Sequence, residues 1–291
     1  MGRRLFCEIS PLTYKISVFK GITLRKVKNL IAVIRGERFA KAKTEEKLPI
    51  VVYRHKSLIR RRLGNADMRL QENKATNLAI AAPCISGVLI KPGETFSFWQ
   101  LVGNPSEKRG FLEGLTIERG KPSSGTGGGM CQMSNLIHWM ALHSDLDIAE
   151  HHHHDGLDLF RDYGRQVPFG TGTSVMYNYL DYRLKNNTDN TFQLVIYSDG
   201  EYLCGELRAE KRSDKSFHIK AENERFVRDG DDVYRTGQVY RRVYDAKTGE
   251  LLESRVIREN YAKVMYDTEG LTIEEKVYND TIINNDMEEK L

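Results

Sequence analysis

Three consecutive glycines, Gly127 to Gly129, constrain this chain more than any other feature, because an apolar run begins directly after them. Glycine readily takes a positive φ and lets other backbone segments approach closely. The apolar run contains Cys131 and continues to Leu142. The pattern predicts a tight turn followed by a helix that carries Cys131 in its first turn.

That position suits a thiol nucleophile. The free N–H groups and the positive end of a helix dipole favour thiolate over thiol. The backbone near Gly129, or the amide of Gln132, could donate hydrogen bonds to a developing oxyanion. A nucleophilic cysteine also needs a base, and His151 to His154 follow about twenty residues later. The alternative is a buried cysteine beside a flexible glycine loop.

The histidine run allows three interpretations. It could supply one catalytic base, for which we select His154, or it could be a solvated loop. As a metal site it is poor, since successive residues of an extended chain point to opposite sides and at most two could share an ion. We therefore predict no metal and no cofactor. His138, on the predicted helix, is about 10 Å along the axis from Cys131, which suits a core or surface residue.

Length and composition describe a globular protein. The 291 residues are enough for one large or two smaller domains, with 40% hydrophobic and 29% charged residues. The four cysteines are widely scattered, which indicates neither a disulfide framework nor a zinc site and suits a reducing compartment. No long apolar run stands near the N-terminus, so we expect a cytoplasmic protein without leader or membrane span.

The basic character of the chain is concentrated in residues 1–62, which hold 17 Lys and Arg against 4 Asp and Glu. Apolar residues spaced by three and four within 11–43 predict a basic amphipathic helix or helix pair. Its apolar face could pack on the main domain, or the helix could lie on an anionic membrane surface. No phosphate loop or recognised nucleic-acid motif accompanies it, so we predict no nucleic-acid partner.

The remaining patterns predict an α+β fold. Residues 67–82, with Asp67 as a cap, predict a helix that ends at Pro83. Residues 85–90 and 95–98 predict a hairpin about a type II turn at Pro92-Gly93. Further predicted strands are 174–182, 191–197 and several beyond Gly205. We divide the chain into an arm (1–62), a core domain (63–204) and a β-rich extension (205–291).

Several of these segments resemble the VanW family, over roughly residues 70 to 200. The resemblance rests on five motifs: Asn77-Leu78-Ala79, the segment from Gly87 to Trp99, Gly114-Leu115-Thr116, the segment from Gly127 to Leu136, and the segment from Asp181 to Thr188. It implies a link to glycopeptide resistance and to the bacterial cell wall.

Some exported members of the wider family look like L,D-transpeptidases that cross-link peptidoglycan stems through a cysteine. Cys131 matches their nucleophile and His154 the histidine that follows it. Gly172 stands where the family usually has an aspartate, expected to orient a histidine. The resemblance implies a peptidoglycan stem peptide or precursor as the partner.

Weaker candidates for substrate binding are Arg109 and Arg119, which could receive a carboxylate, and Ser97, in the predicted hairpin. Three functions compete: a cysteine-dependent acyl-transfer enzyme, a non-catalytic accessory module that binds a cell-wall precursor or a partner of the resistance pathway, and a membrane-peripheral adaptor that works through the basic arm.

Overall fold

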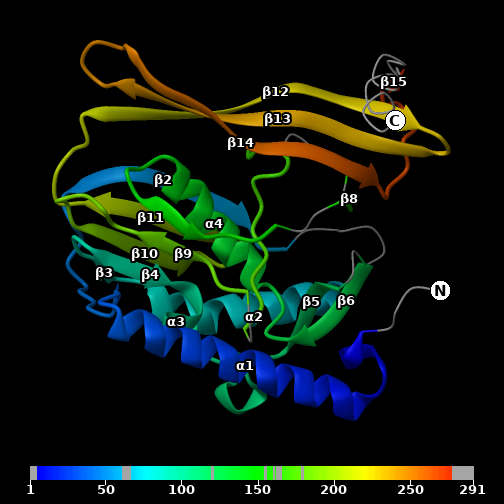
Figure 1. Cartoon of the computed structure of the whole chain (residues 1–291), viewed down its shortest axis with the longest axis horizontal. Helices are drawn as coiled ribbons and strands as arrows, with labels where there is room; N and C mark the ends of the chain where they lie inside the picture. Colours follow the sequence, from blue (N-terminus) through cyan, green and yellow to red (C-terminus); the bar gives the residue numbers. More distant parts are fainter. Residues whose placement is uncertain are drawn as a thin grey trace, which may run out of the picture.

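A computed structural model describes residues 5–60, 67–118, 121–153, 156–159, 161, 166–177 and 180–276. It confirms the α+β class, with helices below and between the sheets and a long β-ribbon above them (Figure 1). The helices are α1 (Pro11–Ile34), α2 (Met68–Ile85), α3 (Phe98–Val102) and α4 (Met130–Leu142), with short 3-10 turns at Phe6–Glu8 and Glu107–Arg109.

The central sheet has the strand order β2-β11-β10-β3, and all of its pairs are antiparallel. These strands are β2 (Ile50–Leu58), β3 (Val88–Ile90), β10 (Phe192–Ser198) and β11 (Tyr202–Ala209). Helix α4 packs against β11 and β2, while α2 packs against β10. Their facing apolar side chains, such as Leu78, Leu136, Leu194 and Leu207, are fully buried or nearly so and form the main core.

A second sheet has the order β1-β4-β9-β7, formed by Arg38–Phe39, Glu94–Ser97, Arg183–Lys185 and Asp147–Glu150. Strands β5 (Glu113–Glu118) and β6 (Lys121–Thr126) form a separate hairpin that leads into the glycine run. The predicted helix after that run is confirmed as α4.

The β-rich C-terminal region is also confirmed. Its sheet has the order β15-β12-β13-β14-β8, formed by Ile273–Glu275, Lys215–Asp229, Asp232–Asp245, Leu251–Val264 and Leu157–Asp158. Arg241 of β13 joins this sheet to α4, because its guanidinium donates to the carbonyls of Leu142 (2.9 Å) and Ser144 (2.8 Å). A buried cation at a helix C-terminus satisfies the last carbonyls and favours the dipole.

The three-part division of the chain stays a prediction. The structure adds that β2, within residues 1–62, is a strand of the central sheet, and that position 204/205 falls inside β11. Both strands pair with each other, so the central sheet draws on segments from either side of the predicted core.

The predicted hairpin over residues 85–98 is wrong, although its turn is present. Gly93 has a φ of 74° and the Glu94 amide donates to the Lys91 carbonyl (2.9 Å), as a type II turn requires. However, β3 pairs with β10 and β4 pairs with β1 and β9. Type II geometry splays the flanking strands instead of matching their twist, so each strand joins a different sheet.

Two further boundaries differ from the sequence prediction. Helix α2 continues past Pro83 to Ile85, and the Lys43 ammonium donates to the last-turn carbonyls of Pro83 (2.8 Å) and Cys84 (2.6 Å). The predicted strand 174–182 is replaced, in its described part, by an isolated bridge between Met176 and Leu180. Phe192–Ser198 confirms the predicted strand at 191–197.

Asn186 fixes the turn between β9 and β10. Its side-chain amide donates to the carbonyls of Ile90 (2.8 Å) and Asn190 (2.7 Å), and its oxygen accepts from Thr188. The residue is fully buried. We expect Asn186→Ala to lower the free energy of unfolding by about 2 to 3 kcal/mol, because it leaves several buried polar groups without a partner.

Asn187→Ala is the matched control, since Asn187 is exposed and bonds Asp147 at the surface. In urea titrations of both variants, Asn187→Ala should change the free energy of unfolding by less than about 0.5 kcal/mol. Equal losses in the two variants would contradict the role of Asn186.

Candidate functional site

The glycine turn before α4 is held by close packing. Gly129 is the N-cap of α4 and has a φ of 106°. A Cβ on Gly129 would lie 2.3 Å from Cγ of Lys74, and one on Gly128 would lie 2.3 Å from the backbone carbon of Gly114. The glycines therefore serve as contact points for α2 and β5.

The side chain of Asn77, on α2, holds this turn by hydrogen bonds to the backbone. The residue is fully buried, and its amide nitrogen donates to the carbonyls of Gly128 and Leu112, both at 2.9 Å. Its oxygen accepts from the Leu112 amide at 2.7 Å. The sequence marked Asn77 as part of a motif without assigning it a function. The structure shows that it positions the start of α4.

Cys131 is the second residue of α4, as predicted, but its thiol is not in the predicted state. The residue is half-buried and packs against the main core. Burial raises the pKa of the Cys131 thiol, and hydrogen bonds, the first to the Val175 carbonyl, only partly offset this effect. The S–H donates to Val175 at 3.9 Å. The expected preference for thiolate is therefore wrong in direction, because desolvation disfavours the anion.

The segment from Gly172 to Val175 is attached along α4 beside Cys131. The Asn135 oxygen accepts from the backbone amide (2.5 Å) and the hydroxyl (2.9 Å) of Thr173. Ser134 also forms a short hydroxyl contact with Thr173. Gly172 stands where the wider family usually has an aspartate. A Cβ on Gly172 would lie 3.7 Å from the carboxamide oxygen of Asn135, so this position is beside α4.

Gln132 is occupied elsewhere. Its amide nitrogen donates to the carbonyl (3.3 Å) and hydroxyl (3.0 Å) of Ser57 and to the Leu58 carbonyl (2.9 Å), so it ties α4 to β2. An oxyanion-stabilising function for this side chain would have to compete with those three contacts. The main-chain N–H groups of the first turn remain the better donors for that purpose.

The histidine run divides between two sides of the chain, as the period of an extended segment requires. His151 and His153 turn toward α4, with ring centroids 4.0 Å apart, and His151 lies 4.2 Å from the ring of His138. His152 turns the other way and contacts Glu150 at 3.0 Å. The selected base, His154, lies outside the described residues.

His138 and His151 are neutral at pH 7. Burial, followed by repulsion from His151 and His153, lowers the pKa of His138 well below its ordinary value. Burial and repulsion from His153 lower the pKa of His151 to about 4. Nδ1 of His138 shares a hydrogen bond with the Tyr182 hydroxyl (2.9 Å), while Nε2 of His151 contacts the Gly172 carbonyl (3.3 Å).

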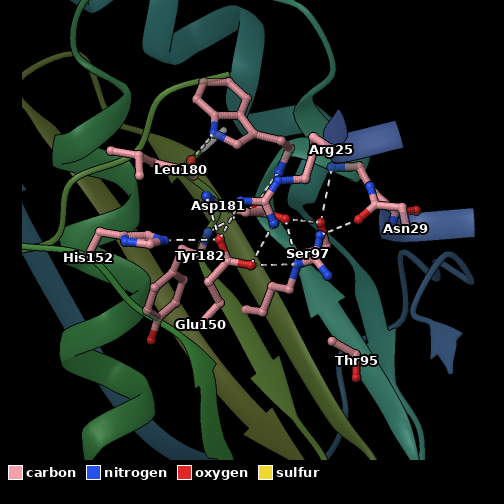
Figure 2. A network of polar contacts seen from close by, with 12 residues as sticks. Arg25, Asn29, Thr95, Ser97, Glu150, His152, Leu180, Asp181 and Tyr182 are labelled. Carbon is pink, nitrogen blue, oxygen red and sulfur yellow. Dashed lines mark hydrogen bonds and ion pairs between the residues drawn. The ribbon is translucent and has the colours of Figure 1, made fainter. Parts of the chain in front are cut away.

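Glu150 and His152 belong to a polar network on the opposite side (Figure 2). Arg25 of α1 binds both carboxylate oxygens of Glu150, at 2.7 and 2.8 Å. The Asp181 amide donates to Glu150 (3.1 Å), while Asp181 itself accepts from Ser97 (2.6 Å) and Arg183 (2.8 Å). Burial alone would raise the pKa of Glu150, but the hydrogen bonds from Arg25, His152 and the Asp181 amide outweigh burial and lower this pKa to about 2.

The weaker candidates have structural contacts. Ser97 is almost fully buried, donates to Asp181 and caps α3. The Arg109 guanidinium donates to the carbonyls of Val102 (2.7 Å) and Asn104 (2.8 Å), so it holds the loop after α3. Arg119 lies outside the described residues.

Two surface hollows, of about 600 and 510 Å³, are lined by residues of the C-terminal sheet and by residues 104–108 with Thr126, respectively, and not by Cys131. The second hollow adjoins the glycine turn. Within the described part of the chain, no group of three or more His, Cys, Asp or Glu side chains could hold a metal ion.

The comparisons with known proteins cover most of the chain. The chain is 31% identical over 250 residues to the vancomycin B-type resistance protein VanW of Enterococcus faecalis. The aligned region is 84% of this chain and 90% of that protein. The chain belongs to the VanW family. The model of the family described as "VanW like protein" matches residues 73–208 of this VanW-family chain.

A shorter match is the uncharacterized protein YoaR of Bacillus subtilis, 29% identical over 118 residues, which are 40% of this chain and 36% of that protein. No solved structure is significantly similar to this VanW-family chain. The matched region 73–208 contains Asn77, the glycine turn, α4 and the histidine run.

The packing at the glycine turn predicts a sharp difference between two glycines. Gly128→Ala should lower the free energy of unfolding by about 3 kcal/mol, because the new methyl would collide with the backbone of Gly114. Gly125→Ala, three residues before Gly128 and within strand β6, meets only ordinary contacts with Thr116, the nearest at 3.5 Å. Thermal unfolding of both variants measures this difference, and similar midpoints would contradict it.

The neutral histidines predict acid sensitivity. In the unfolded chain these rings bind protons as the pH falls below about 6.5, whereas folded His151 binds one only near pH 4. Stability is therefore full above pH 6.5 and is lost as the pH falls from there toward 4. His151→Phe should reduce the loss between pH 8 and pH 5 by about 1 to 2 kcal/mol.

Urea titrations at the two pH values measure this loss. The comparison at pH 8, where the ring is neutral in either state, gives the separate cost of losing the Gly172 contact. If wild type and variant lose equal stability on acidification, folded His151 accepts the proton readily and the prediction is wrong.

Proposed function

We propose that this chain takes part in glycopeptide resistance by acting on peptidoglycan-related peptides, with Cys131 as its nucleophile. The name of its E. faecalis relative supports the biological setting. The observation that carries the chemical proposal is the position of Cys131 in the first turn of α4, two residues after the left-handed Gly129 that caps the helix. At a helix N-terminus, main-chain N–H groups can stabilise a tetrahedral oxyanion.

In the proposed reaction the Cys131 sulfur attacks a carbonyl of a stem peptide, and a base accepts the thiol proton. The tetrahedral intermediate collapses to a thioester, and the leaving amine takes the proton back. An acceptor amine or water then attacks the thioester and releases the sulfur. His154 keeps its predicted function as the base, on the resemblance that matches it to the histidine following the nucleophile in the wider family.

The environment of the thiol makes deprotonation the difficult step. Because burial raises the pKa of Cys131, the resting state is the neutral thiol bonded to Val175. A substrate that displaces this contact and brings the base closer would have to complete the site. The hollow beside the glycine turn, lined by residues 104–108 and Thr126, offers a place for an extended peptide.

A second candidate is a non-catalytic module that binds the same peptides. Two observations favour it: the raised pKa of Cys131, and glycine at position 172, where the wider family has the aspartate expected to orient a histidine. This function needs no thiolate and would survive the loss of the sulfur.

Intact-protein mass spectrometry separates the two functions. The full chain is incubated with a synthetic stem tetrapeptide and an acceptor amine at pH 7 and pH 9. We expect an acyl adduct that is absent in Cys131→Ala and retained in Cys204→Ala, a matched cysteine of the central sheet. The adduct should form faster at pH 9, because more of the thiol is ionised there.

Calorimetry with the same peptide supplies the contrary outcome. If wild type forms neither adduct nor product, and the peptide binds wild type and Cys131→Ala equally, the chain is a binding module and the enzymatic proposal fails.

A further inference from the structure

A helix on the surface of a globular domain usually turns its apolar face toward the core, and α1 does not. No residue of α1, which the structure describes throughout, is buried. Its inner face carries Val18, Ile22, Arg25 and Asn29, which lie on one side at spacings of three and four. Arg25 binds Glu150, and Asn29 accepts from Arg183 at 2.6 Å. The sequence alternative in which the apolar face packs on the main domain is therefore wrong.

The apolar face of α1 points away from the body of the protein. Leu12, Phe19, Leu30 and Ile34 are 67, 72, 60 and 75% exposed, and they lie within a narrow arc opposite Arg25. Ile16 and Val27 complete this outer face. In Figure 1 the helix lies along the lower edge of the molecule, with the sheets on one side of it. Exposed apolar surface of this extent marks an interaction site.

The charges of α1 identify the chemistry of its partner. The helix holds Lys15, Lys20, Arg25, Lys26 and Lys28 and no acidic residue. At 100° per residue, Lys15 and Lys26 border the outer face on one side and Lys20 borders it on the other. An apolar stripe bordered by lysines matches an anionic bilayer surface, where the acyl boundary receives the apolar residues and the headgroups receive the lysines.

We propose that α1 lies in the plane of an anionic phospholipid membrane and attaches the protein to it by the outer face defined above. A second copy of the chain fits less well, because two such faces in contact would bring lysines together with no carboxylate from either helix to pair them. Within the described part of the chain, no helix is long and apolar enough to cross a bilayer.

The Arg25–Glu150 pair determines which face of α1 is available. Its atoms are less than one fifth exposed, and the pKa of Glu150, about 2, keeps the carboxylate ionised at neutral pH. The bidentate contact prevents the helix from rolling its apolar side onto the protein. The side chains of Leu5, Phe6 and Ile9, which precede α1, are also more than half exposed and extend the apolar surface.

Vesicle flotation tests the proposal with the full chain. We expect wild type to float with vesicles of phosphatidylcholine and phosphatidylglycerol (7:3) and to bind phosphatidylcholine vesicles at least tenfold more weakly. The triple variant Phe19→Gln, Leu30→Gln, Ile34→Gln should bind the anionic vesicles at least tenfold more weakly than wild type. These residues make no core contact, and circular dichroism will verify that the variant is folded.

The matched control is Leu251→Gln with Leu252→Gln, two apolar residues of β14 that are about half exposed. It should bind as wild type does, and so should Cys131→Ala, since the attachment does not depend on the proposed chemistry. Wild type that fails to float, or a triple variant that floats equally well, would overturn the proposal. So would sedimentation showing a dimer that the triple substitution dissociates, without binding of wild type to vesicles.

Discussion

The buried side chain of Asn77 holds together the elements on which the rest of the site depends. It bonds to the backbone at Gly128 and Leu112, and thereby fixes helix α2, the β5–β6 hairpin and the start of α4 relative to one another. The glycines allow those backbones to touch, and Asn77 satisfies the polar groups that the contact buries. The position of Cys131 follows from this arrangement, because it is the second residue after the turn.

The charged and the neutral polar side chains near the site lie on opposite sides of residues 150–153. On one side of the chain at 150–153, Glu150 is ionised and shares its charge with Arg25, His152 and Arg183. On the other side, His138 and His151 lie close together and remain uncharged because they are buried. One short segment therefore joins the contact with α1 to the ring cluster on α4. The proposed membrane helix and the ring cluster beside α4 are connected through residues 150–153.

Much of the site was visible in the sequence. The glycine run and the apolar residues after it predicted α4 and the place of Cys131 correctly, and the alternation of the histidines predicted that they divide between two sides. Sequence reasoning missed the contacts of Asn77, Thr173 and Tyr182, which join residues 38 to 51 positions apart. It also offered Ser97 and Arg109 for substrate binding and Gln132 for the oxyanion, whereas the polar groups of these three side chains bond to the protein itself.

The sequence by itself determined the elements whose causes are local: the α4 start, the type II turn at Pro92-Gly93, the strand at 191–197 and the basic amphipathic character of α1. Tertiary structure alone decided the partners of those elements. In the tertiary structure, β3 and β4 belong to different sheets, and the apolar face of α1 lies outward. Burial in that structure also raises the pKa of the Cys131 thiol. The physical reason is that periodicity and turn chemistry act over a few residues, whereas desolvation and pairing depend on which distant segments come together.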